Sequence, residues 1–218
     1  MKKIVGWVSL IIVLMLAVAV YFYFSPLMPA KIATHWNMYG LADGFSSKTL
    51  GLFLFPGIAV ILTAILLFLP ALDPKKENIQ LFEEAYHRFI IVFLLFLFFL
   101  FFLTILWNLS WVFSFNQALA AGMAWFFYET GKLLSQAKMN YTIGIRTPWT
   151  LHSEEAWTKT HEIVSRWTTF LCLLLLLGVF FPKYFFLILI VFLILFIGLS
   201  FGVSYWVYKK TKTNQPKL

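Results

Sequence analysis

Six long apolar stretches, separated by short polar connectors, make up most of this chain. They cover residues 4–24, 50–69, 89–113, 118–134, 163–181 and 184–208. A helix rises about 1.5 Å per residue, so a stretch of about 20 residues matches a hydrocarbon core about 30 Å thick. The sequence therefore predicts six membrane-spanning helices.

The composition supports an all-α integral membrane protein. Hydrophobic residues make up 61% of the chain, charged residues only 12%, and the mean hydropathy is +0.86, which excludes an ordinary soluble domain. Inside a bilayer every backbone amide must be hydrogen-bonded within the protein, so only helices and closed barrels can span it. The runs are continuous rather than alternating, which favours helices. The first run follows Lys2-Lys3 like a signal peptide, but it is longer than a signal core, and we expect it to be retained.

The basic residues predict the orientation. If the N-terminus lies inside, six spans leave only Lys31, Lys48 and Lys183 of the 17 lysines and arginines on the outer side. Such an excess of inner charge is what the positive-inside rule expects, so both termini are predicted to be cytoplasmic. The net charge of +8 is then a topology signal, and it predicts no direct contact with nucleic acid.

Residue types that carry metal or redox chemistry are scarce. Cys172 is the single cysteine, so an intramolecular disulfide and a two-thiol metal site are excluded. We expect no metal site and no cofactor.

The connector over residues 25–49 is predicted to lie outside the membrane. Two prolines end the first helix, while Asn37, Gly40 and the pair Asp43-Gly44 are strong turn formers. We expect a structured, turn-rich loop in which Trp36, Tyr39 and Phe45 suit the bilayer interface. Two interpretations remain open, an anchored loop that carries the pH-sensitive His35 and a binding site.

The connector over residues 138–162 is predicted to be cytoplasmic. Gly144 permits an unusual backbone angle or a close contact, and Pro148 holds Thr147 away from helical angles. Ser153 followed by two glutamates is a good helix start. Arg146 presents a planar fork that can pair with a carboxylate or with a lipid phosphate, so a partner contact and headgroup anchoring are both open.

Two acidic residues lie near the ends of predicted spans. Glu129 precedes Lys132 by three residues and Glu162 precedes Arg166 by four, so each acid has a helical-neighbour base. An acid inside a membrane is a functional candidate, but pairing and snorkelling near the interface is the simpler explanation.

The spans also contain packing signals. Ala118 and Gly122 are four residues apart, as are Ala120 and Ala124, which predicts that the fourth span packs closely against a neighbour. The phenylalanine-rich run over residues 89–102 is expected to face lipid.

Both connectors carry residues that resemble the SdpI-type immunity family, bacterial plasma-membrane proteins that protect a producer cell from its own secreted toxic peptide. The outer motif consists of Pro29, Ile32, His35, Trp36, Asn37, Gly40, Asp43, Gly44, Ser47 and Lys48, with Pro56 in the next span. The inner motif consists of Asn140, Ile143, Gly144, Ile145, Arg146, Thr147, Trp149, Thr150, Leu151, Ser153, Glu154 and Trp157.

This resemblance implies a division of the chain and a set of partners. Residues 1–70 would be a two-span module with the outer loop, and residues 71–218 a four-span SdpI-like module with the inner loop. It implies contact with a secreted toxic peptide and with membrane lipids and, in some members, capture of a cytoplasmic transcriptional repressor. It supplies no catalytic residues. The implied toxin-binding residues are Pro29, His35, Trp36, Asn37, Gly40, Asp43, Gly44 and Lys48. The implied inner-loop residues are Asn140, Gly144, Arg146, Thr147, Trp149 and Trp157.

Two other functional classes are alternatives to this prediction. Residues 83–88 read Glu-Glu-Ala-Tyr-His-Arg and fit the Glu-Glu-x-x-x-Arg pattern of CAAX-type intramembrane proteases, which need further histidines within spans. His35 and His152 lie in connectors and His161 at an expected helix start. A small transporter would need an internal repeat or midplane polar residues, and only Asn108 and Ser110 qualify. We therefore predict a non-enzymatic immunity protein.

Overall fold

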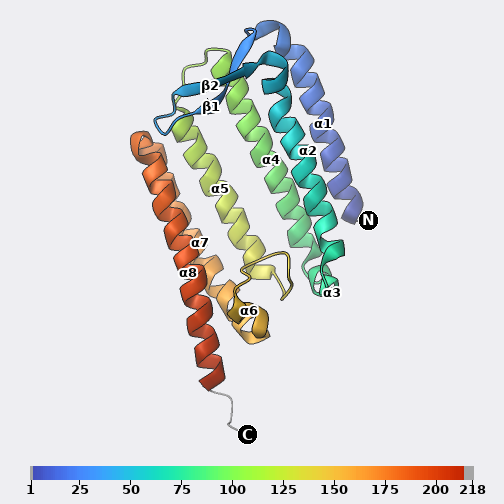
Figure 1. Ribbon diagram of the computed structural model, residues 1–218, viewed down its shortest axis with the longest axis vertical. Helices are drawn as coiled ribbons and strands as arrows, with labels where there is room; N and C mark the ends of the chain where they lie inside the picture. Colours follow the sequence, from blue (N-terminus) through green and yellow to red (C-terminus); the bar gives the residue numbers. More distant parts are fainter. Residues whose placement is uncertain (1, 214–218) are drawn as a thin grey trace.

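The computed structural model describes residues 2–213, except for the side chains of residues 2–6, 9 and 13. Lys217 and the side chains of Lys2 and Lys3, which the charge argument places inside the cell, lie outside the described part. The chain forms long helices that run side by side along one axis (Figure 1). The long helices are α1 (Lys2–Phe24), α2 (Lys48–Leu72), α4 (Glu83–Asn108), α5 (Phe115–Gln136), α7 (Glu154–Phe180) and α8 (Phe185–Thr213).

Short elements connect these helices at the two ends of the bundle. At one end lie the 3₁₀ turns η1 (Ser25–Leu27) and η2 (Pro182–Tyr184), and at the other α3 (Lys76–Gln80) and α6 (Pro148–His152). Five of the described helices, all the long ones except α5, are long and apolar enough to cross a membrane. Helix α5 has 22 residues, and polar side chains such as Gln117 and Glu129 lower its hydropathy. The architecture is that of a multi-pass helical membrane protein.

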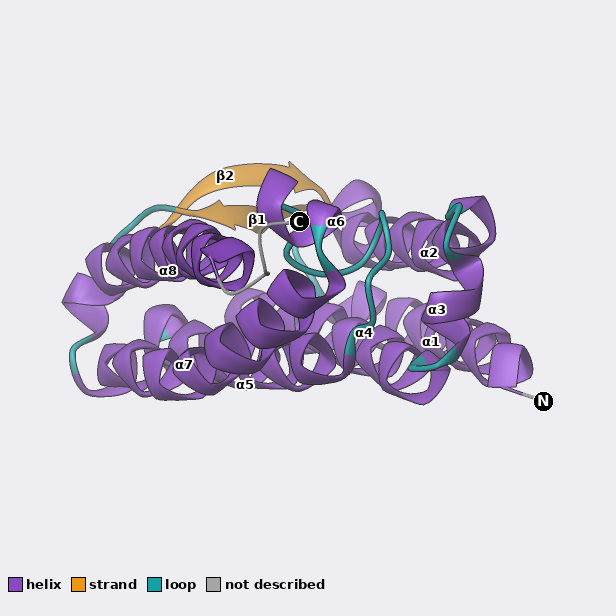
Figure 2. Cartoon of the chain, turned by 90° about the horizontal axis from the view of Figure 1, so that it is seen from below, coloured by secondary structure: helices purple, strands orange, loops and turns teal. Residues whose placement is uncertain are grey.

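The helices pack in two groups that meet at the α4–α5 contact. Helices α1, α2 and α4 contact one another, and α7 contacts both α5 and α8. Seen along the bundle, α7, α5, α4 and α1 form one layer, with α8 and α2 above it in the view of Figure 2. The domain boundary expected after residue 70 stays a prediction.

The outer connector contains regular structure that the turn signals did not predict. Strands β1 (Lys31–Trp36) and β2 (Ala42–Ser47) form an antiparallel hairpin, with Lys31 opposite Ser47 and Trp36 opposite Ala42. The ladder is irregular on both sides of His35. The expectation of a turn-rich loop was correct only for the tip, because β-branched residues such as Ile32 favour a pleated surface. Within residues 2–213 the fold is all-α apart from this hairpin.

The expectation that residues 89–102 face lipid was wrong for much of the run. Phe96 and Phe101 are buried, and the Phe96 ring stacks on Phe126 of α5 with centroids 4.7 Å apart. Phe102 is 44% exposed. Helix α4 lies between α1, α2 and α5, so neighbouring helices cover most of its circumference, which hydropathy alone does not reveal.

The small residues of α5 pack as predicted. A Cβ on Gly122 would lie 2.3 Å from the Phe99 ring of α4, so only glycine allows this approach. Ala120 is fully buried, and a Cβ on Gly178 of α7 would lie 2.9 Å from its methyl group. The side chains of α5 are small at these contacts, so α4 and α7 can pack close to its backbone.

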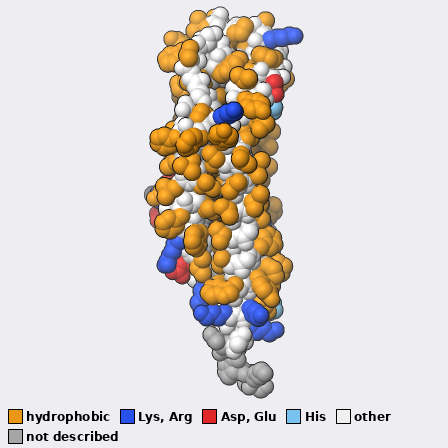
Figure 3. All heavy atoms as spheres, turned by 90° about the vertical axis from the view of Figure 1, so that its left-hand side faces the viewer, with side chains coloured by type: hydrophobic (Ala, Val, Ile, Leu, Met, Phe, Trp, Pro, Cys, Tyr) orange, Lys and Arg blue, Asp and Glu red, His pale blue; other side chains and the backbone are white. Residues whose placement is uncertain are grey.

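The surface agrees with a membrane location. Hydrophobic side chains cover the middle of the face that carries α8, while lysine and arginine lie mainly toward the two ends (Figure 3). A broad apolar belt of this kind matches a bilayer core bordered by polar headgroup layers.

Candidate functional site

A side chain of α4 fixes the hairpin to the bundle by forming the backbone hydrogen bonds that a third strand would form. Asn108, the last residue of α4, accepts a hydrogen bond from the Ala33 N–H at 2.7 Å and donates one to the Ala33 carbonyl at 3.1 Å. Its amide also donates to the Thr104 carbonyl. Ala33 is fully buried, so these bonds satisfy backbone groups that water cannot reach.

A second asparagine connects three segments at the hairpin end of the bundle. The amide nitrogen of Asn116, at the start of α5, donates to the Met38 carbonyl of the hairpin tip at 3.0 Å and to the Pro182 carbonyl of η2 at 3.1 Å. At the other end of the hairpin, Lys48 Nζ donates to the Ser25 carbonyl at 2.9 Å. The hairpin is thereby held at both of its ends.

The polar residues predicted for the outer site are brought together on the exposed side of the hairpin. His35 Nδ1 and Asp43 Oδ1 lie 2.5 Å apart across the two strands, with 72% and 44% of their side chains exposed. A Cβ on Gly44 would lie 2.8 Å from the His35 Cβ, so glycine is needed beside this pair. Asn37 closes the tip by accepting from the Tyr39 and Leu41 amides.

Two other residues predicted for the outer site shape the chain instead of supplying a polar group: one is at the hairpin tip and the other precedes β1. Gly40 has a φ of +77° at the tip, a value that favours glycine. Pro29 is exposed and lies in the short segment before β1. Neither side chain adds a polar group to the His35–Asp43 pair.

Trp36 packs on the bundle rather than standing free at the interface. Its ring stacks on Phe115 with centroids 4.3 Å apart, and it meets Trp107 edge-on at 5.8 Å. Tyr39 and Phe45 are 60% and 58% exposed, as an interfacial position requires. The interfacial position of all three residues stays a prediction, and the structure adds that β1 packs the Trp36 ring against α4 and α5.

An apolar cavity of about 210 Å³ lies beneath β1. Residues of helices α2, α4, α5 and α8 line it together with β1, and most of the atoms that face it are apolar. The lining residues are Thr34, His35, Trp36, Asn37, Phe55, Leu100, Phe115, Asn116, Leu119 and Phe186. Trp36 Nε1 and Asn116 Oδ1 are buried without a hydrogen-bond partner among the described residues.

The inner loop is organised around a buried asparagine. Asn140 Oδ1 accepts from the amides of Thr142 at 2.9 Å and Ile143 at 2.6 Å. Its amide nitrogen donates to the carbonyls of Lys138 and Ile143. A fully buried side chain with every polar group in use defines one loop conformation.

Gly144 provides both features that the sequence suggested for it. Its φ is +120°, and a Cβ would lie 2.6 Å from His161 Nε2. The imidazole of His161 stacks on the Trp157 indole, and its Nε2 accepts from the Ile145 N–H at 2.9 Å. Because the amide can only donate and the Trp157 carbonyl can only accept, His161 is neutral with its proton on Nδ1.

The placement of His161 corrects an expectation. It was expected at a helix start, outside the spans, yet it lies inside α7, 1% exposed, in a helix apolar enough to cross a membrane. Helix α7 begins at Glu154, where Ser153 caps it as predicted by accepting from the Ala156 amide.

The remaining predicted inner residues secure the loop. Thr147 forms a reciprocal capping box with Thr150 at the start of α6, and its ψ of 160° is non-helical, as expected before proline. Trp149 meets the Tyr205 ring of α8 at 5.2 Å, and Trp157 Nε1 donates to the Ala137 carbonyl. Arg146 is exposed, and its Nη1 donates to the Tyr141 carbonyl at 2.8 Å.

Asp73, at the end of α2, connects the two halves of the inner end. It is 3% exposed and accepts three hydrogen bonds, from the Lys75 amide at 2.7 Å, the Tyr141 amide at 2.9 Å and the Thr142 hydroxyl at 2.8 Å. Donors on both sides stabilise a buried carboxylate in this position.

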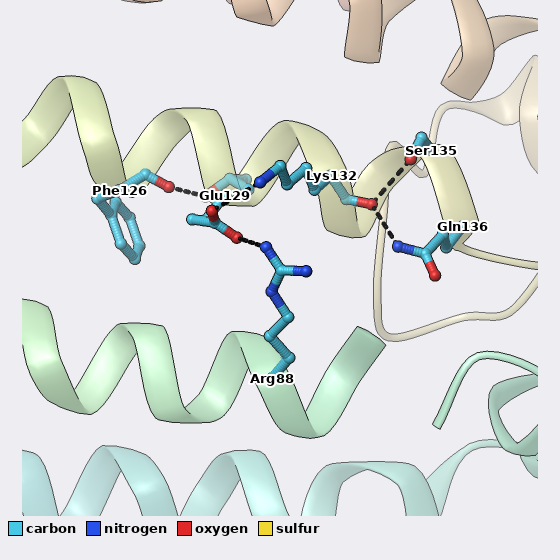
Figure 4. A network of polar contacts seen from close by, with 7 residues as sticks. Arg88, Phe126, Glu129, Lys132, Ser135 and Gln136 are labelled. Carbon is cyan, nitrogen blue, oxygen red and sulfur yellow. Dashed lines mark hydrogen bonds and ion pairs between the residues drawn. The ribbon is translucent and has the colours of Figure 1, made fainter. Parts of the chain in front are cut away.

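Glu129 forms ion pairs with two basic residues, one on its own helix and one on α4. Lys132 Nζ lies 3.0 Å from one carboxylate oxygen, as the sequence predicted, and Arg88 of α4 donates to the other at 2.6 Å (Figure 4). Glu162 pairs with Arg166 on the exposed side of α7, also as predicted. Glu129 therefore joins α5 to α4, while Glu162 stabilises one helix.

The residues of the protease-like pattern lie at the start of α4. His87 Nδ1 is 3.8 Å from the Glu83 carboxylate, and Arg88 is directed to Glu129. Within residues 2–213, the described side chains contain no group of three or more His, Cys, Asp or Glu residues that could hold a metal ion.

Asn108, Asn116 and Asp73 are the important residues that sequence reasoning did not place in a site. Each bonds to backbone groups more than 60 residues away, so no local pattern identifies the partner. The available signal was a polar side chain at the end of an apolar run. Asn108 carries this signal, but in the sequence alone it is only a polar residue of the kind that a transporter would need.

Comparison with known proteins supports the resemblance seen in the two connectors. Residues 136–205 match the SdpI/YfhL protein family, and residues 10–60 match a domain of unknown function, DUF1648. The chain is 27% identical over 185 residues to the immunity protein SdpI of Bacillus subtilis strain 168, covering 84% of this chain and 86% of that protein. No solved structure matches the chain.

Proposed function

We infer from these matches that the chain is an SdpI-type membrane protein, and we propose that it gives its cell immunity against a secreted toxic peptide. The observation that carries the proposal is the outer hairpin. It presents the His35–Asp43 pair and exposed apolar side chains on a support that Asn108 and Asn116 hold to the bundle. A surface already held in place loses little conformational entropy when a peptide binds.

We propose that all six long helices cross the bacterial plasma membrane, with both termini in the cytoplasm. Helix α5 is less apolar than the others, but it runs the length of the bundle between α4 and α7. Two of its polar groups are directed inward, since Glu129 pairs with Arg88 and Asn116 is 3% exposed. Neighbouring helices thus remove the cost that these groups would have in lipid.

Cysteine labelling tests this topology. In a Cys172→Ala background we expect a cysteine at Tyr39 to react with an impermeant reagent in intact cells, because that side chain is exposed on the outer hairpin. Cysteines at Glu77 and at Lys212 should react only after the membrane is opened. Labelling of the Lys212 position from outside would mean an odd number of spans and would remove α5 from the set.

A resistance assay tests the immunity function. We expect His35→Ala and Asp43→Ala each to weaken protection by about 5- to 30-fold in the tolerated peptide concentration, the equivalent of a lost contact of about 1–2 kcal/mol. The matched control is Thr49→Ala, an exposed change at the same end of the bundle. Protection is measured in a sensitive strain challenged with candidate peptides, at equal membrane abundance. Full protection by both variants would leave the hairpin as an anchor only.

A second role, capture of a cytoplasmic transcriptional repressor, would belong to the inner loop. The observation that favours it is a loop with one defined conformation that exposes the Arg146 side chain. Asn140 and Gly144 hold this loop against α7, so an arriving protein would meet a preformed surface.

A further inference from the structure

One edge of the outer hairpin is closed and the other is open. Asn108 occupies the N–H and the C=O of Ala33, the groups through which β1 could have paired with another strand. In an antiparallel ladder both backbone groups of one residue point to the same side. Ala33 therefore turns them away from β2, and Phe45, its partner across the ladder, turns its own away from β1.

The outer edge of β2 thus presents an N–H and a C=O at Phe45. Strand β2 lies farther from the helices than β1 (Figure 2), and within the described residues no side chain or loop forms a hydrogen bond with these two groups. The side chain of Phe45 is 58% exposed. Unpaired edge groups beside an exposed apolar side chain are a template for an added strand.

We propose that this edge binds an extended, apolar segment of the toxic peptide as a third strand of the sheet. The inference rests on the proposed immunity function and specifies how its outer site recognises a partner. The segment's backbone pairs with the N–H and C=O of Phe45, and its alternate side chains lie along Phe45 and toward Leu41 at the tip. Main-chain pairing of this kind requires the partner to be extended but places few requirements on its amino-acid sequence.

A flexible peptide fits this edge better than a second copy of the protein. The strand has six residues and is irregular near His35, so two rigid bundles meeting along it would bury far less than the roughly 1,600 Å² typical of a stable complex. A peptide can continue past the strand and cover Tyr39 and Leu41, which are 60% and 64% exposed.

Amide hydrogen exchange of the full-length protein in lipid nanodiscs tests the open edge. We expect the Phe45 amide to exchange at least about tenfold faster than that of Ser46, whose groups pair with Ile32. Adding a synthetic hexapeptide with the β1 sequence Lys-Ile-Ala-Thr-His-Trp, a segment that pairs with the opposite edge of β2 within the protein, should slow exchange at Phe45. A Phe45 amide that is protected without peptide would overturn the inference. Protection that grows with protein concentration would also overturn it and assign the edge to a second copy.

Resistance of two variants separates this inference from the immunity proposal. Phe45→Pro removes the outward N–H without removing a ladder bond, whereas Phe45→Val keeps the N–H and changes only the side chain. We expect Phe45→Pro to protect about tenfold less than Phe45→Val at equal abundance. If the two protect equally while Asp43→Ala loses protection, the immunity site stands and the added strand is wrong. If all three protect fully, both proposals fail.

Discussion

Gly144→Ala is expected to lower the free energy of unfolding by about 3 kcal/mol or more, because two independent costs meet at this residue. A side chain at a φ of +120° is strained, and the new methyl group would lie 2.6 Å from His161 Nε2. To relieve the clash, His161 must move off the Trp157 ring and lose its hydrogen bond from the Ile145 amide. The inner loop would then separate from α7.

Thermal unfolding of the purified protein in detergent measures this effect, and Gly202→Ala is the matched control. A Cβ at Gly202 meets nothing within 4 Å and the residue lies inside α8, so alanine should be neutral or slightly stabilising there. Equal unfolding temperatures for the two variants would show that the loop does not adopt the backbone conformation described for Gly144.

Asp73→Ala is expected to cost about 3 kcal/mol in the free energy of unfolding and to loosen the inner end of the bundle. The change leaves the partly buried amides of Lys75 and Tyr141 and the hydroxyl of Thr142 without this acceptor, and a fully buried donor left unsatisfied costs about 1–3 kcal/mol. Asp73→Asn keeps one carbonyl oxygen and should lie between the alanine variant and the native protein.

Limited proteolysis at residues 138–147, combined with thermal unfolding, measures both consequences. The control is Asp43→Ala, because this carboxylate is exposed on the hairpin at the opposite end and an exposed pair contributes little to stability. If Asp73→Ala and Asp43→Ala unfold at the same temperature, Asp73 does not hold the two halves of the inner end together.

Local features of the chain could be predicted because they depend on neighbours in the sequence. Apolar length predicted the long helices, Ser153 predicted the start of α7, and the spacing of Glu129 and Lys132 predicted their ion pair. Gly144 was recognised because few other residue types tolerate its conformation or its close contact. In each case the relevant energy is set within about one helical turn or one loop.

The structure of the two ends was decided by contacts between distant segments. Asn108 docks a hairpin 75 residues earlier in the chain, Asn116 joins two loops, and Asp73 joins α2 to the inner loop. Hydropathy marks a residue as apolar but does not tell whether lipid or another helix covers it, so the burial of Phe96 and Phe101 could not be read from the sequence.

The amino-acid sequence by itself determined that this is a helical membrane protein and which connectors carry the motifs that resemble the SdpI-type family. Only the tertiary structure decided that the outer connector is a hairpin with one closed edge and one open edge. The physical reason is that a strand edge is closed by whatever side chain the packed helices bring to it, and here that side chain is Asn108 at the end of α4.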